Sequence, residues 1–293
     1  MKLDLHVHIR RHHRIDNLRR VIKARGLDGI AVTNFHNITL AQYLRDRIAD
    51  FLIIVGQEVE SKAGHILAIH LEEKIPDHLE PAETIRRIHA QGGMAILAHP
   101  YLGWNSILPH GRARHLPFDA VEVFNYRAAP MLYPNFLAQL GLQKLTLPGV
   151  ANTDSKELPT IGLCYNELPV QPASRYDLGL ANKMIPEILH CIRQGRIRRH
   201  ETRQAPNWKW LRANLSNLIF PQRHYRCFFC GDKIVFKLIR RTYICLECGR
   251  QEARNVCCVR GHFVCSACRT QRALETPEFY AFREKLERMA HDQ

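Results

Sequence analysis

The segment Leu3-Asp4-Leu5-His6-Val7-His8 decides how the fold of this chain is interpreted. It begins with aliphatic residues and places two histidines two positions apart. On a strand, alternate residues share a face, so His6 and His8 would point the same way. Two neutral imidazoles held side by side provide half of a metal site. The segment therefore predicts a strand that ends in a pair of metal ligands.

Short apolar runs follow along the chain and alternate with helical patterns, which predicts βα units around a parallel sheet or barrel. The functional residues of such a barrel lie at the carboxyl ends of its strands. The runs 30–33, 51–55, 66–69, 94–98 and 145–150 lie next to His36, Glu58, His65, His99 and Asp154. The barrel would therefore gather these potential metal ligands in one pocket.

The order of these motifs resembles that of the PHP (polymerase and histidinol phosphatase) superfamily over roughly residues 1–200. The resemblance implies an α/β fold, a distorted (β/α)7 barrel, and a metal-dependent phosphoesterase with two or three divalent metals (Zn, Mn or Fe). Carried over by motif, the first metal would be held by His6, His8, Glu58 and Asp154. The second would be held by Glu58, His65 and His99, with Glu58 bridging the two metals.

The third metal of the family is where this chain departs from the pattern. His13, or His12 in its place, and His36 correspond to two of its ligands. The family's third ligand, a His two residues after the late Asp, is replaced by Lys156. A protonated ammonium cannot ligate a metal, so we expect this site to be weak or absent. Lys156 would instead place positive charge near a substrate phosphate.

The ligand set predicts the chemistry, which is attack of a metal-bound hydroxide on a phosphoester. The catalytic candidates are Glu58, Asp154, Lys156, Arg10 and Arg11, the two arginines as phosphate ligands or as part of a solvated loop. We expect the substrate to be a nucleic acid or a nucleotide. The alternatives are a phosphatase of a small phosphorylated metabolite and a non-catalytic nucleic-acid-binding protein with a degenerate barrel.

Cysteine supplies the second strong pattern, since eight of the ten cysteines fall between residues 227 and 268. Three C-x-x-C pairs predict a zinc-ribbon-like module with two structural zinc ions: Cys227 with Cys230, Cys245 with Cys248, and Cys265 with Cys268. Cys257, Cys258 and His262 compete to complete the second zinc site. The chain shows no signal peptide or long apolar segment, so we expect a reducing, cytoplasmic setting without disulfides. Cys164 and Cys191 are expected to be buried apolar residues.

The length of 293 residues allows one large domain and a small one. We expect a barrel at 1–200, a basic linker at 201–226, a zinc module at 227–270 and a terminal helix at 271–293. The net charge is +14, and residues 193–250 hold fourteen Lys or Arg against three acidic residues. Basic charge interleaved with Trp208 and Trp210 suits nucleic acid, unless both tryptophans pack the linker on the barrel. The zinc module could also contact a protein partner.

Overall fold

The computed structural model describes residues 1–10, 13–102, 113–131, 133–202, 234–246 and 249–263. The chain divides into two compact units, and each is described by itself. The first unit comprises Met1–Ile9 and Ile15–Ala205, and the second comprises Arg10–Arg14 and Pro206–Gln293. The expected linker tryptophans, most of the expected zinc ligands and the expected terminal helix lie outside the described residues.

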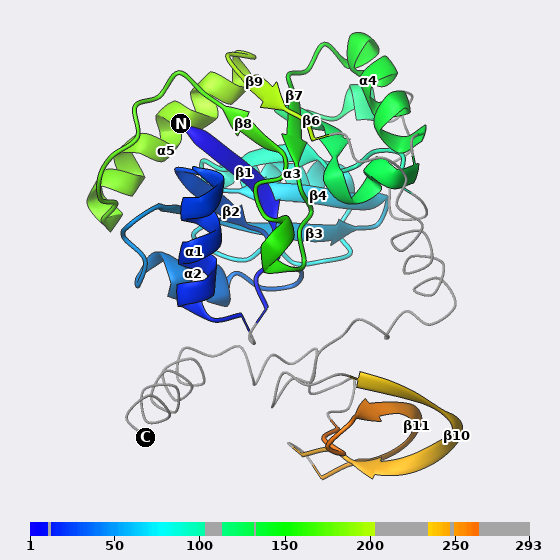
Figure 1. The fold of residues 1–293 in the computed structure, drawn as a ribbon. Helices are drawn as coiled ribbons and strands as arrows, with labels where there is room; N and C mark the ends of the chain where they lie inside the picture. The colour runs from blue at the N-terminus through cyan, green and yellow to red at the C-terminus, as the bar shows by residue number, and fades with distance from the viewer. Residues whose placement is uncertain (11–12, 103–112, 132, 203–233, 247–248, 264–293) are drawn as a thin grey trace. The chain divides into compact units, whose positions relative to one another are not determined.

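The first unit is built on one mixed, nine-stranded sheet with the order β7-β6-β5-β4-β3-β2-β1-β8-β9 (Figure 1). The strands are β1 (Lys2–Val7), β2 (Gly29–Val32), β3 (Leu52–Ser61), β4 (Gly64–Ile69), β5 (Met94–Leu97), β6 (Ala120–Asn125), β7 (Gly149–Asn152), β8 (Tyr165–Glu167) and β9 (Arg198–His200). Strands β1 to β3 are parallel, as are β5 to β7. Strand β4 is antiparallel to both of its neighbours, and β8 and β9 continue the sheet in antiparallel fashion beyond β1.

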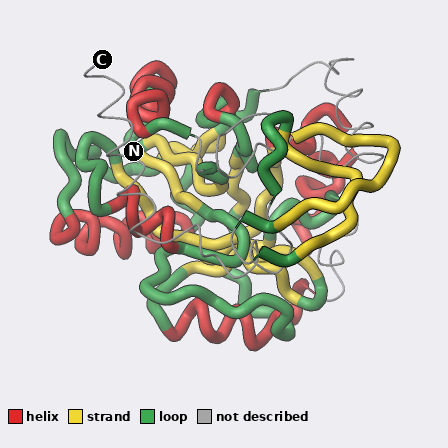
Figure 2. Tube along the Cα trace, turned by 90° about the horizontal axis from the view of Figure 1, so that it is seen from below, coloured by secondary structure: helices red, strands yellow, loops and turns green. Residues whose placement is uncertain are grey.

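Helices surround the strands of the first unit (Figure 2). Among the described residues these are α1 (Ile15–Arg25), α2 (Thr39–Arg45), α3 (Pro81–Ala90), α4 (Tyr133–Leu145) and α5 (Leu178–Arg193), with short 3-10 turns η2 (Ala113–His115), η3 (Tyr126–Met131) and η4 (Leu158–Thr160). Helix α5 packs apolar residues at helical spacing against the strand side chains of the main core. These residues are Ile185, Ile188, Leu189 and Ile192. Cys164 and Cys191 are buried, which confirms their predicted place.

Strand β7, at one end of the sheet, returns to lie beside β1 and β8, so the sheet is barrel-like. Val7 forms a parallel bridge with Ser155, and the His8 N–H donates to the Ser155 carbonyl at 2.8 Å. Asn166 of β8 accepts from the Ala151 N–H at 2.9 Å and donates to the Ala151 carbonyl at 2.8 Å, which ties β8 to β7. The expectation of an α/β fold with a barrel-like sheet is confirmed at this level.

The regular βα alternation expected from the sequence was wrong between β3 and β4. Strand β3 continues through Glu58 instead of ending before it, and then turns directly into β4. The reason is that Glu58 and Leu67 pair in an antiparallel hairpin, so no helix separates the two strands. The expected strand at 145–150 also begins later, because α4 extends to Leu145 and Thr146 follows with a φ of 53°.

The second unit contains an antiparallel hairpin of β10 (Ile234–Ile244) and β11 (Gln251–Cys258). The apolar side chains of Ile244, Leu246 and Val259 are 59%, 54% and 55% exposed. The buried side chains include the thiols of Cys245, Cys257 and Cys258 instead. Among the residues of the second unit whose burial is described, three cysteines are buried while these three aliphatic side chains are exposed.

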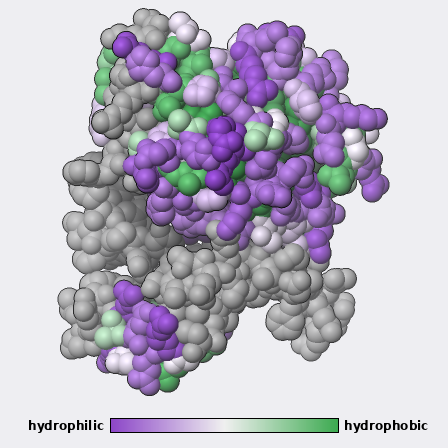
Figure 3. Space-filling view, turned by 180° about the vertical axis from the view of Figure 1, so that it is seen from behind, coloured by the Kyte–Doolittle hydropathy of each residue, from purple (hydrophilic) through white to green (hydrophobic). Residues whose placement is uncertain are grey.

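The described surface is largely hydrophilic on the face drawn in Figure 3, with small hydrophobic areas between the polar ones. Within the described ranges, no helix combines the length and the apolar character needed to cross a bilayer.

Asp4 fastens β1 to the segments that follow β7. Its fully buried carboxylate accepts hydrogen bonds from the Thr153 N–H at 3.1 Å, the Thr153 hydroxyl at 2.5 Å, the Gly162 N–H at 3.1 Å and the His6 N–H at 3.4 Å. Burial raises the pKa of Asp4 to about 6, and these four hydrogen bonds oppose a larger rise. The group is therefore central to closing the sheet.

Replacing this carboxylate should destabilise the first unit. Asp4→Asn places an amide N–H₂ among groups that all donate, so we expect a loss of roughly 2–4 kcal/mol in the free energy of unfolding. The matched change Asp16→Asn, at an exposed carboxylate on α1 that pairs with Arg19, should change it by less than about 0.5 kcal/mol. Denaturant unfolding of both variants measures the difference. Equal stability of the two would contradict the closing role of Asp4.

Candidate metal centre

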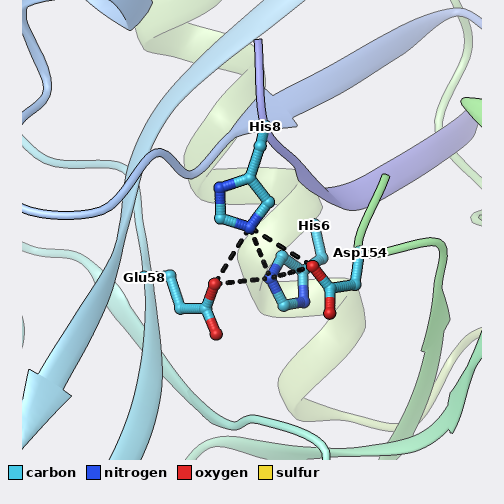
Figure 4. A group of neighbouring side chains, drawn as sticks. All are labelled: His6, His8, Glu58 and Asp154. Carbon is cyan, nitrogen blue, oxygen red and sulfur yellow. Dashed lines mark hydrogen bonds and ion pairs between the residues drawn. The ribbon is translucent and has the colours of Figure 1, made fainter. Parts of the chain in front are cut away.

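Four donor side chains from three segments of the first unit converge beside the end of β1 (Figure 4). His6 lies on β1, His8 follows it, Glu58 lies on β3, and Asp154 follows β7. The His8 Nε2 atom is 2.9 Å from Glu58 Oε2 and 3.3 Å from Asp154 Oδ1. The His6 Nε2 atom is 3.2 Å and 3.7 Å from the same two oxygens. All four side chains are buried.

A second group adjoins the first through Glu58. The other oxygen of this carboxylate, Oε1, is 2.6 Å from His65 Nδ1 and 3.0 Å from His99 Nε2. His65 is the second residue of strand β4, and His99 follows β5. Glu58 therefore divides its two oxygens between two groups of donors, as a carboxylate that bridges two cations would.

The donor set and its spacing fit a divalent metal. Tetrahedral zinc, bound to nitrogen and oxygen at about 2.0–2.2 Å, would separate its ligand atoms by roughly 3.3–3.6 Å. The His6 and His8 Nε2 atoms are 3.3 Å apart, which falls in this range. Asp154 Oδ1 is buried and accepts no hydrogen bond from the described residues. The first unit thus contains buried His, Glu and Asp groups that could hold metal ions.

Backbone conformation marks two of the donors as strained. His99 has a φ of 24° and Asp154 a φ of 49°, in the left-handed region that side-chain-bearing residues rarely adopt. Neither position is a glycine, so each conformation costs free energy that the surrounding structure must offset. Such residues concentrate at functional sites. The strain turns both side chains toward Glu58 and its neighbours.

The electrostatics of the centre keep three of its donors in metal-binding form. Burial alone would raise the pKa of Glu58, yet the charge of His6 and hydrogen bonds from three histidines hold it well below its ordinary value. Burial would likewise raise the pKa of Asp154, and Lys156 and His6 hold it well below the ordinary range. Burial, followed by the charge of Lys156, lowers the pKa of His8 and favours its neutral form. Ionised carboxylates and a neutral imidazole are the forms that bind metals.

His6 shows how strongly this site attracts a cation. Burial lowers the pKa of His6, but the negative charges of Asp154, Glu122 and Glu58 raise it well above its ordinary value. The same three charges would act on a divalent cation in the same place.

Lys156 and Phe35 lie beside the first group. The Lys156 ammonium is 3.7 Å from Asp154 Oδ1 and 5.0 Å from the centre of the Phe35 ring. Phe35 in turn stacks on His8, with ring centres 4.9 Å apart. The aromatic ring therefore holds the lysine charge next to the donor set by a cation–π contact. Lys156 is placed where it could meet an anion bound at the centre.

The structure brings six of the predicted ligands together, and His36 of the same unit lies apart from them. His36 bonds through Nδ1 to Asp77 Oδ2 at 2.9 Å and belongs to neither group of donors. His13 and Arg10 belong to the second unit, and the Arg10 N–H donates to His13 Nδ1 at 3.2 Å. Arg11 and His12 lie outside the described residues. Metal binding by the six ligands stays a prediction.

Sequence reasoning overlooked Glu122 in the middle of β6. It is buried, and its Oε1 lies 3.1 Å from His6 Nδ1. The available signal was a lone acidic residue inside the apolar run Val121-Glu122-Val123, where an unpaired charge would be costly.

Comparisons with known proteins give matches to part of the chain and distant structural likenesses. No family model matches it. The chain is 35% identical over 111 residues to the uncharacterized protein MJ1587 of Methanocaldococcus jannaschii, which covers 37% of this chain and 64% of that protein. The chain thus spans a little under two thirds of the length of the curated relative that it matches.

Three solved structures are distantly similar, each at 14% sequence identity. PsfC from Pseudomonas syringae has a TM-score of 0.49 and covers 75% of this chain and 98% of its own. Endonuclease Q, in complex with a 27-mer duplex that contains an abasic lesion, has a TM-score of 0.45 and covers 78% and 68%. The lesion-specific endonuclease PfuEndoQ from Pyrococcus furiosus has a TM-score of 0.44 and covers 78% and 67%. Likenesses this distant support no statement about activity.

Metal should stabilise the first unit through Glu58. We expect Mn²⁺ or Zn²⁺ at 100 times its dissociation constant to add about 2.7 kcal/mol to the free energy of unfolding, and a chelator to remove that gain. Glu58→Gln should abolish the gain, because it weakens both groups at once. Glu60→Gln, the same change two residues further along β3 and outside both groups, should retain it. Thermal unfolding with and without metal distinguishes these outcomes, and a full metal response in Glu58→Gln would contradict the centre.

Proposed function

We propose that this chain is a metal-dependent phosphoesterase of the PHP type that acts on a nucleic acid or nucleotide. The observation that supports it most directly is the division of Glu58, with one oxygen facing His6, His8 and Asp154 and the other facing His65 and His99. Two adjoining donor groups around one carboxylate suit two divalent cations. Paired divalent cations activate water near neutral pH and stabilise both the attacking and leaving oxygens of a phosphoryl displacement.

The chain's own residues would prepare the site for that reaction. His6, His8 and Asp154 would hold one cation, His65 and His99 the other, and Glu58 both. Because these side chains are buried, few water molecules compete with the substrate for the site, and its electrostatic interactions are strong. Lys156, fixed over Phe35, would bind a non-bridging phosphate oxygen and offset its negative charge.

The basic character of the chain supports a polyanionic substrate. Residues 193–250 hold fourteen basic against three acidic residues, and the chain as a whole carries +14. Part of this stretch belongs to the first unit, since Arg198 and Arg199 lie on β9. Clustered Lys and Arg attract nucleic acid through release of its counterions. Thiolates bound to zinc would reduce the net positive charge of the second unit without altering that of β9.

Activity should depend on Glu58 and, to a smaller extent, on Lys156. We expect Glu58→Gln to lower phosphoester turnover by at least about 100-fold, because both cations lose a ligand. Lys156→Gln should lower kcat/KM by roughly 100-fold, as removal of a positioned charge at a developing oxyanion does. Lys62→Gln, at an exposed lysine paired with Glu80, should not change it.

A panel of an oligonucleotide, a mononucleotide and an aryl phosphate identifies the substrate class. Preference for the oligonucleotide that falls steeply with salt supports the nucleic-acid assignment. Equal turnover of all three would favour a small-metabolite phosphatase. Binding of the oligonucleotide without turnover of any of them, in metal-loaded protein, would indicate a non-catalytic binding protein.

We also propose that the second unit folds around zinc. Cys245, Cys257 and Cys258 are buried, while the aliphatic side chains of Ile244, Leu246 and Val259 are exposed. Buried thiolates joined by zinc would supply folding free energy to a unit of this size. Cys227, Cys230, Cys248, Cys265 and Cys268 remain proposed ligands on their spacing alone.

Zinc content should follow the cysteines of the hairpin. In the Glu58→Gln background, which removes the other metals, we expect two zinc ions per chain. Cys245→Ser should reduce this to about one, because one site loses a thiolate ligand. Cys191→Ser, at a buried cysteine on α5, should leave two. Elemental analysis of the purified chains provides the test, and unchanged zinc in Cys245→Ser would argue against a site at that cysteine.

A further inference from the structure

Glu122 is a buried carboxylate that belongs to neither donor group, yet it contacts a member of each. Its Oε1 atom is 3.1 Å from the Nδ1 atom of His6, whose other nitrogen faces Glu58. Its Oε2 atom accepts the backbone N–H of His99 at 2.9 Å. Its side chain is fully enclosed. One carboxylate therefore connects both groups through atoms that do not contact Glu58.

Glu122 has no oxygen to spare for a metal. Besides His6 and His99, the side-chain amide of Asn152 donates to Oε1 at 3.0 Å, and that of Asn125 donates to Oε2 at 3.0 Å. Neither side-chain amide can rotate to exchange its nitrogen and oxygen without losing a hydrogen bond. Asn152 Oδ1 already accepts from the Leu5 N–H, and Asn125 Oδ1 from the Ala128 N–H. Four donors thus saturate the carboxylate, and it can act on a metal only through His6 and His99.

The backbone around Glu122 is arranged to hold it in place. The register of β6 against β7 shifts between Glu122 and Phe124, and that of β1 against β2 shifts between Asp4 and Val7, which includes His6. Such bulges redirect side chains and are frequent beside functional sites. The two partners of this contact therefore both lie at irregular points of otherwise regular strands.

We propose that Glu122 is a positioning residue that keeps the proton of His6 on Nδ1 and leaves Nε2 as the metal ligand. The inference rests on the proposed metal centre. A histidine ligand is oriented and made more basic when its other N–H donates to a carboxylate. Through the His99 N–H, the same carboxylate would also hold the strained turn that directs His99 toward Glu58. Glu122 would thereby couple the orientation of one ligand in each group.

The isosteric change Glu122→Gln separates positioning from space filling. The amide nitrogen of the glutamine must take the place of Oε2, facing the His99 backbone N–H, or of Oε1, facing His6 Nδ1. The His99 N–H can only donate, whereas His6 Nδ1 can accept if the imidazole proton moves to Nε2. The second arrangement costs less. It removes the acceptor of the Asn152 amide, whereas the first removes the acceptors of both the His99 N–H and the Asn125 amide. A proton on Nε2 removes the lone pair that would bind the metal. Metal affinity should therefore fall more than the stability of the metal-free protein.

The test is Mn²⁺ binding to the full-length chain, followed by electron paramagnetic resonance, because Mn²⁺ prefers oxygen and nitrogen ligands to thiolates. We expect Glu122→Gln to bind 10–100-fold more weakly than the wild type. Glu167→Gln is the matched control, since Glu167 on β8 also pairs with a histidine, His200, at 2.7 Å. It should bind as the wild type does. Thermal unfolding of the metal-free chains reports any purely structural loss.

Glu58→Gln in the same series separates the two proposals. If Glu58→Gln fails to bind while Glu122→Gln binds like the wild type, the positioning role is overturned and the metal centre stands. If the wild type shows no binding that depends on Glu58, both fail.

A measurement on the wild type covers the case in which Glu122→Gln does not fold. In zinc-loaded protein with ¹⁵N-labelled histidine, the proposal requires a slowly exchanging Nδ1 proton on His6, identified by its proximity to the Asn152 amide protons. A His6 ring protonated at Nε2, or without a protected Nδ1 proton, would overturn it.

Discussion

Closure of the sheet beside β1 rests on buried polar side chains instead of a continuous ladder of backbone hydrogen bonds. Asp4 joins β1 to the segment after β7, and Asn166 joins β8 to β7. Each polar atom in this network has a partner, which offsets the cost of burying it. The closure matters beyond stability, because it brings Asp154 to His6 and His8. Without it, one of the two donor groups would not exist.

Much of the donor set could be predicted from the sequence because it is local to strand ends. The alternation within Leu3-Asp4-Leu5-His6-Val7-His8 and the positions of Glu58, His99 and Asp154 after apolar runs sufficed. These signals depend only on which residue follows which. They survive errors in strand boundaries, as the continuation of β3 through Glu58 illustrates.

Features that depend on distant partners could not be predicted. His36 was expected near a third metal, but its partner is Asp77, 41 residues further along the chain. Glu122 was overlooked because its role depends on contact with His6, which lies 116 residues earlier in the chain. The register shifts in β1 and β6 could not be predicted either. Side-chain alternation assumes a regular strand, and a register shift changes the face of the sheet on which a residue lies. The β3–β4 hairpin, by contrast, depends on residues that are close in the sequence, since β3 ends at Ser61 and β4 begins at Gly64.

The sequence separations within the two donor groups differ greatly, and this has a consequence for how the protein is made. Glu58 and His65 are seven residues apart on one hairpin, whereas Asp4 and Thr153, whose contact brings Asp154 into place, are separated by 149 residues. Loop-closure entropy favours local pairings early in folding and delays distant ones. During synthesis, the hairpin half of the centre can therefore form as soon as the first hundred residues have left the ribosome, and the other half must wait for β7. A nascent chain would thus present an incomplete ligand set, able to hold a cation loosely, before the last strands of the sheet complete its enclosure.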